Sequence, residues 1–169
     1  MRLLLKALLF SGFLSFFYTS AFSQNCGNVI TQNKKIGGTH VLMTDEQTLV
    51  VRGNYSYSIS LFSDEKGILA NVYSKSGVEF NQDDEIIFMD RNKTRKSYRF
   101  IEMGEMTKKG GQPIYQNILQ LDLAAIDWFA STTINTIYIK NNTSNEMRKF
   151  TVNPNRQASF KLMSTCFSK

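Results

Sequence analysis

A strict alternation of large and small residues between Tyr55 and Leu61 constrains the fold of this chain more than any other feature. Every second residue of the segment is a serine, and the residues between the serines are Tyr55, Tyr57, Ile59 and Leu61. Successive side chains of a strand point to opposite faces, so this pattern predicts a strand with one bulky and one small face. Polar residues and Gly67 follow as a turn, and 68–73 predicts the returning strand of a hairpin.

Similar short segments recur along the chain and predict a mainly β fold. Further strands are predicted at 39–43, 48–52, 85–90, 97–103, 115–121, 134–140 and 147–152. The hydrophobic period changes at 123–130, which predicts a short helix with Asp122 as its N-cap. Asn153 and Pro154 predict the N-cap and first residue of a second short helix, which continues to about Thr165. We therefore expect a single antiparallel β-sandwich or partly open barrel with two short helices, one of them near the C-terminus. The helices would plug an open end or cover an edge strand.

The N-terminus has the pattern of a secretory signal peptide. Arg2 and Lys6 precede an apolar run over 8–17, and small residues stand at positions 21 and 23. We predict cleavage after Ser23, which leaves one domain over 24–169 and no transmembrane segment. An uncleaved anchor is disfavoured because the apolar run is short for a span of about 20 residues. The protein is therefore expected in the periplasm, outside the cell or at its surface.

Two cysteines, Cys26 and Cys166, stand near the two ends of the predicted domain. In an oxidising compartment such a pair is most simply interpreted as one disulfide. Two free buried thiols and intermolecular pairing remain as alternatives. Lipidation of Cys26 is disfavoured because Ser23-Gln24-Asn25 replaces the small, partly aliphatic run that normally precedes a lipidated cysteine.

The charge of the chain is moderate, but its cations gather in one place. Loss of Arg2 and Lys6 on cleavage lowers the formal net charge from +6 to +4. Nucleic-acid binders more often show a dense basic stripe with interleaved aromatics, so we do not expect a nucleic-acid partner. One local cluster comprises Arg91, Lys93, Arg95, Lys96 and Arg99. A solvated hairpin with cationic edges is the favoured interpretation, and the alternative is a surface that attracts anionic envelope surfaces, glycans or an acidic partner. Trp128 is either a core residue of its helix or a docking residue.

No residue pattern indicates catalysis, a cofactor or a metal. His40 is the one histidine of the sequence, and nothing in the sequence supplies the partners that a catalytic histidine needs. A single histidine with a disulfide does not provide an ordinary zinc site. Asp83, Asp84 and Glu85 are adjacent and could contribute to Ca²⁺ binding, but a solvated loop is the expected interpretation. The run from Asp90 lacks the glycine and the glutamate of an EF-hand loop.

Three segments together carry a resemblance. The signal segment ending Ala21-Phe22-Ser23 before Gln24, together with 83–88 (DDEIIF) and 137–142 (IYIKNN), resembles small exported β-rich envelope proteins of Gram-negative bacteria. The resemblance implies a periplasmic or surface location and brings no activity or site residues.

Two hypotheses of function follow. The first is a non-enzymatic binding or assembly module of the bacterial cell envelope, which contacts a protein partner through a sheet face or the cationic hairpin. The second is a small carbohydrate-binding or hydrolytic domain with a carboxylate-lined cleft and Trp128. It requires Trp128 and at least two acids on one concave surface.

Overall fold

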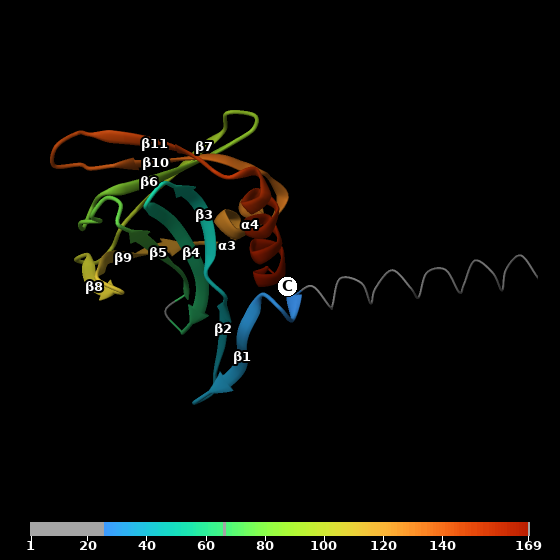
Figure 1. Ribbon diagram of the computed structural model, residues 1–169. Helices are drawn as coiled ribbons and strands as arrows, with labels where there is room; N and C mark the ends of the chain where they lie inside the picture. The colour runs from blue at the N-terminus through green and yellow to red at the C-terminus, as the bar shows by residue number, and fades with distance from the viewer. Residues whose placement is uncertain (1–25, 66, 169) are drawn as a thin grey trace, which may run out of the picture.

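The computed structural model describes residues 26–65 and 67–168, and the predicted signal peptide lies outside these residues. The described chain forms two antiparallel sheets and two helices in a sandwich-like arrangement that does not close into a barrel (Figure 1). This confirms the predicted mainly β class, including the helix near the C-terminus.

The larger sheet has the strand order β1-β2-β4-β5-β9-β8, and β3 also pairs with β4. Its strands are β1 (Ile30–Ile36), β2 (Thr39–Thr44), β3 (Gln47–Arg52), β4 (Tyr55–Asp64), β5 (Gly67–Lys75), β8 (Glu105–Lys109) and β9 (Gln112–Leu121). The alternation in β4 has the predicted effect, because Tyr57, Ile59 and Leu61 are at most 2 % exposed and face the core. The intervening serines therefore lie on the other face of this sheet.

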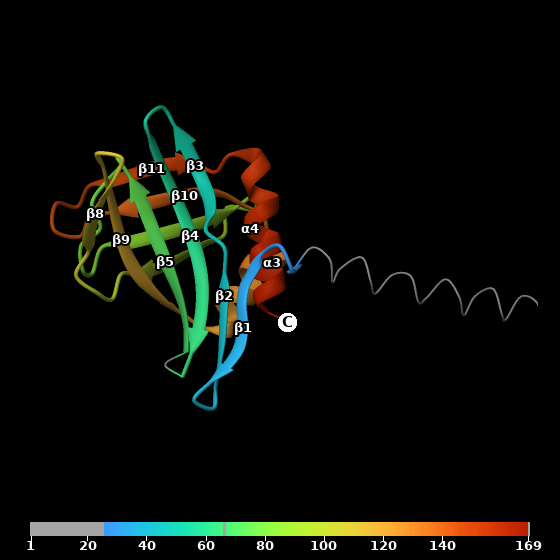
Figure 2. The same cartoon turned by 60° about the horizontal axis from the view of Figure 1, so that its bottom comes forward.

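The smaller sheet has the order β11-β10-β6-β7. Its strands are β6 (Glu85–Asp90), β7 (Arg95–Arg99), β10 (Ile134–Lys140) and β11 (Met147–Thr151). Strands β10 and β11 run crosswise to β3 and β4 in both views (Figures 1 and 2). A single bridge between Phe100 and Leu119 links the end of β7 to β9.

Two helices, α3 (Leu123–Ser131) and α4 (Pro154–Phe167), pack against each other at one end of the sandwich (Figure 1). The predicted N-cap of α3 is confirmed, because the Asp122 carboxylate accepts the Ala125 amide at 2.7 Å. Asn153 precedes Pro154 as predicted, yet its side chain does not cap α4. Its Oδ1 accepts the Val51 amide at 2.8 Å instead, which ties the start of α4 to β3.

The two cysteines form the predicted disulfide. Cys26, just before β1, is bonded to Cys166 in α4, with their Cα atoms 5.4 Å apart. The first and last described residues therefore lie together, as Figure 1 also shows.

The structure differs from the sequence prediction in three elements. Strand β1 was not predicted, and 107–113 is not a loop, because β8 and β9 meet there in a tight hairpin with Gly110 and Gly111 at positive φ. The strand predicted over 97–103 ends at Arg99, and beyond it Ile101 and Met103 are 41 % and 75 % exposed.

Neither described helix is long and apolar enough to cross a membrane.

Candidate functional site

The pleat of β7 divides the predicted cationic cluster between the two faces of the smaller sheet. Arg95 lies over the ring of Tyr138, with Cζ 5.2 Å from the ring centroid, and Arg99 Nε is 3.3 Å from Glu85 Oε1. Lys96 is on the other side of the strand, because successive residues of a strand alternate. Its Nζ lies 5.2 Å from the ring centroid of Trp128 and 3.5 Å from the Ala124 carbonyl oxygen.

The other two cations of the cluster lie at the tip of the β6–β7 hairpin. Arg91 donates a hydrogen bond to Gln157 Oε1 in α4 at 3.1 Å. Lys93 is in the turn and has a left-handed backbone conformation, with φ 66°. The structure thus brings Arg95 and Arg99 together and places Arg91, Lys93 and Lys96 elsewhere.

Trp128 is partly buried on α3. Its ring packs against that of Phe129, with centroids 5.3 Å apart, and the Lys96 ammonium lies over the ring. The residue therefore belongs to the margin of the core and not to the face that carries Arg95 and Arg99.

The strand register adds two lysines that the sequence analysis did not select. Reading across β11, β10, β6 and β7, one row of the outer face holds Met147, Lys140, Glu85 and Arg99. The next row holds Lys149, Tyr138, Ile87 and Ser97, and the third holds Thr151, Thr136, Met89 and Arg95. We call Arg95, Arg99, Lys140 and Lys149, arranged around Tyr138, the cationic face. No sequence-local signal connects Lys140 and Lys149 to β7, because only the pairing of distant strands does so.

Glu85 is the one acid in these three rows, and it is already engaged. Its side chain is 14 % exposed and accepts hydrogen bonds from Ser97 Oγ at 3.0 Å and from Arg99. Partial burial raises the pKa of Glu85, but hydrogen bonds from Ser97 and Asn142 and the charges of Lys140 and Arg99 outweigh it and lower the pKa below 4.5. Glu85 therefore stays ionised at neutral pH and offsets one of the four positive charges.

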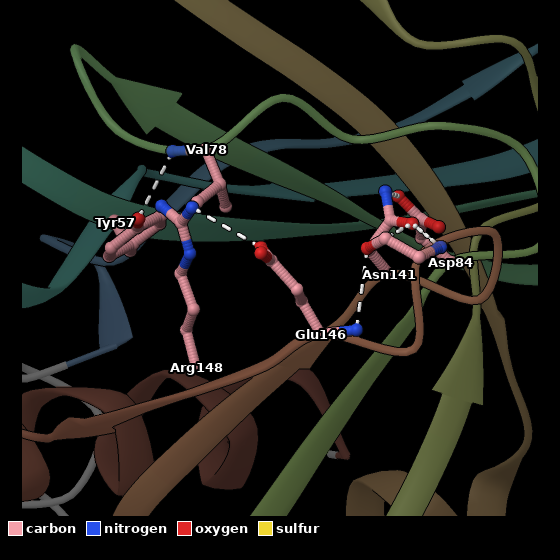
Figure 3. Close-up of polar contacts among 7 residues, drawn as sticks. Tyr57, Val78, Asp84, Asn141, Glu146 and Arg148 are labelled. Carbon is pink, nitrogen blue, oxygen red and sulfur yellow. Dashed lines mark hydrogen bonds and ion pairs between the residues drawn. The ribbon is translucent and has the colours of Figure 1, made fainter.

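A separate cleft of about 330 Å³ lies between the segment that follows β5 and the β10–β11 hairpin (Figure 3). Its polar lining includes Glu79, Asn81, Asp84, Asn141, Glu146 and Arg148. Figure 3 shows the Arg148 guanidinium beside Val78 and Tyr57 on one side and Glu146 on the other. Arg148 Nη2 is 3.5 Å from Glu146 Oε2, and both side chains are more than half exposed, so this ion pair is weak.

The prediction that Asp84 lies in a solvated acidic loop is wrong, because the residue is only 1 % exposed. Its carboxylate accepts hydrogen bonds from the Asn81 amide at 3.0 Å, the Asn142 amide at 3.0 Å and the Asn141 side chain at 3.4 Å. These bonds join the segment after β5 to the β10–β11 hairpin. Because these hydrogen bonds occupy the carboxylate, Asp84 stabilises the cleft and does not offer a free acid or base.

The remaining chemistry-bearing residues do not converge on this cleft. His40 lies in the exposed β1–β2 hairpin, with Nε2 2.7 Å from Asn33 Oδ1. Trp128 does not line the cleft that holds Glu79, Asp84 and Glu146. Within residues 26–65 and 67–168, no group of three or more His, Cys, Asp or Glu side chains is arranged to hold a metal ion.

Comparison of the chain with protein-family models, with curated proteins and with solved structures found no match in any of the three.

Proposed function

We propose that this protein is an exported, non-enzymatic binding module of the bacterial cell envelope and that its cationic face contacts an acidic protein partner. The observation that carries the proposal is the arrangement of Arg95, Arg99, Lys140 and Lys149 around the buried Tyr138 on the outer face of the smaller sheet. Three strands contribute these cations, and the single acid among them is already paired with Arg99.

The composition of this face suits a protein surface. Arginine, tyrosine and methionine are enriched at protein interfaces, and Ile87, Met89 and Met147 add apolar area between the cations. The Arg95 side chain is already held over Tyr138, so less conformational freedom is lost when a partner binds. Exposed lysines at the margin accelerate association with an acidic surface.

The location outside the cytoplasm has independent support from the disulfide. A bond between Cys26 and Cys166 persists in oxidising compartments such as the bacterial periplasm and is rare in the cytosol. Together with the signal-peptide pattern before Gln24, it favours a periplasmic or surface location.

The alternative, a hydrolytic or sugar-binding cleft that includes Trp128, has less support. It needs Trp128 and two acids on one concave surface, whereas the cleft with Glu79 and Glu146 is lined without Trp128. Asp84, the third acid there, has its carboxylate filled by amide donors.

The test is crosslinked affinity purification of the mature protein from its own envelope, with two variants of equal charge. R95S/K149S removes two cations from the cationic face, and K34S/K35S removes two from the exposed strand β1. We expect one stoichiometric acidic protein with wild type and with K34S/K35S, and its loss with R95S/K149S.

The captured protein is then purified and titrated against the module at low and high salt. Direct binding that weakens with salt supports an electrostatic contact. Equal capture by both variants, equal loss in both, or absence of direct binding would reject the cationic face as the contact surface.

A further inference from the structure

The outer face of the larger sheet holds a second hollow, on a different sheet from the cationic face. Its volume is about 350 Å³, and it extends over β4, β5 and β9. Its lining includes Glu46, Ser56, Ser58, Tyr73, Lys75 and Gln116. No residue of this hollow belongs to the cleft or to the cationic face.

The hollow follows from the serine alternation of β4. Ser58 lies opposite Tyr73 of β5, and Tyr73 lies opposite Gln116 of β9. Ser56 lies opposite Lys75 in the adjoining row. Short side chains on β4 beside long ones on β5 and β9 create a step, so the alternation that fills the core with large residues leaves a depression on the opposite face.

Three of the polar groups that border the hollow, those of Glu46, Ser58 and Gln116, are held by side-chain hydrogen bonds. Glu46 and the Ser58 hydroxyl are hydrogen bonded to each other. Gln116 donates its Nε2 to Glu105 Oε2 at 2.7 Å, which orients its amide. Groups fixed in this way lose little freedom when a ligand binds.

The charges and side-chain types of the hollow indicate a class of ligand. Glu46 and Lys75 balance each other, so the lining favours a neutral ligand over an anion or a cation. Tyr73 supplies a partly exposed aromatic ring with a polar tip, and the carboxylate, amide, ammonium and hydroxyl groups around it can donate to and accept from hydroxyls. A sugar matches this aromatic ring with surrounding donors and acceptors, because a sugar ring has apolar faces and many hydroxyls.

We propose that this hollow binds a neutral saccharide, with Tyr73 as the ring-stacking residue and Glu46 and Gln116 as hydrogen-bonding residues. The site is independent of the proposed protein contact. No cleavage of the sugar is involved.

The experiment is affinity electrophoresis of the mature protein in native gels that contain one soluble polysaccharide each. The neutral probes are dextran, a mixed-linkage β-glucan and galactomannan, and the charged probes are dextran sulfate and polygalacturonate. We expect at least one neutral polysaccharide to retard wild type, equally at low and high salt. Salt independence separates this site from the cationic face, whose binding is screened.

Three variants locate the binding. Y73A is expected to weaken the neutral interaction at least about tenfold, the order of effect that loss of an aromatic anchor produces. Y73F keeps the ring and should retain most of the binding, and R95S/K149S on the other sheet should bind like wild type. Near-UV circular dichroism checks that Y73A keeps its fold. The proposal is overturned if no neutral polysaccharide retards the protein, if only the charged ones do, or if folded Y73A binds as wild type does.

Discussion

The Asp84 carboxylate accepts the backbone amide of Asn142 at 3.0 Å, across 58 residues of sequence, and so fixes the β10–β11 hairpin to the segment before β6. Replacement of Asp84 by Ala removes the buried acceptor and leaves this amide and that of Asn81 unpaired in a part-buried place. We expect D84A to lower the free energy of unfolding by about 3 kcal/mol, measured by urea denaturation.

The control for D84A is E79A, which removes an exposed carboxylate from the same cleft. Its expected effect is within about 0.5 kcal/mol. Similar midpoints for D84A and wild type would mean that the Asp84 hydrogen bonds do not hold the two segments together.

Gly104 lies against the backbone of Phe80. An added β-carbon would be 1.7 Å from the Phe80 carbonyl oxygen, a backbone atom that cannot move aside cheaply. We expect G104A to lower the free energy of unfolding by more than about 3 kcal/mol or to prevent folding. G110A is the matched control, because Gly110 has φ +59° with open space around it and should lose only about 1 kcal/mol. Equal losses in the two variants would contradict the steric argument.

The sequence predicted those elements that bury one face, because burial leaves a periodic trace. Strands β4, β5, β6 and β10 and both helices were predicted for this reason. Strands β1 and β8 carry the sequences ITQNKKI and EMTKK, and most described residues of β1 are exposed, so no apolar period marks them. The strand predicted through Met103 was too long because its apolar residues beyond Phe100 are exposed and not buried.

The candidate surface was only partly predictable. Alternation of side chains along β7 places Lys96 on the opposite face from Arg95 and Arg99, so this separation could have been predicted from the sequence. Lys140 and Lys149 reach the same face through the register of β10 with β6 and of β10 with β11, which no local pattern encodes. The burial of Asp84 was equally hidden, since two of its donors, Asn141 and Asn142, are on a hairpin far along the chain.

The disulfide between Cys26 and Cys166 closes a loop with a sequence separation of 140 residues. Chain-entropy models assign such a loop a stabilisation of about 4 to 5 kcal/mol. We expect C26S/C166S to lower the free energy of unfolding by that order, and wild type unfolded in reductant to match it. Reductant should leave the double variant unchanged. Little difference between oxidised wild type and C26S/C166S would show that the bond adds no stability.

Glu85 makes the stability of the smaller sheet dependent on pH. Its pKa in the folded protein is below 4.5, the ordinary value, so the folded state favours the ionised form. The stabilisation is therefore present above about 4.5 and is lost as pH falls through the lower folded pKa. Protonation weakens the contacts of Glu85 with Ser97 and Arg99.

We expect the melting temperature of wild type to decrease between about pH 5 and pH 3 more steeply than that of E85Q, because Gln has no carboxylate to protonate. E146Q is the control, since it removes a carboxylate whose ion pair with Arg148 is exposed and screened. Differential scanning calorimetry of the three proteins at matched ionic strength measures the slopes. Parallel curves for wild type and E85Q would show that Glu85 does not couple protonation to folding. A flatter curve for E85Q alone would assign the acid-dependent loss of folding stability to this residue.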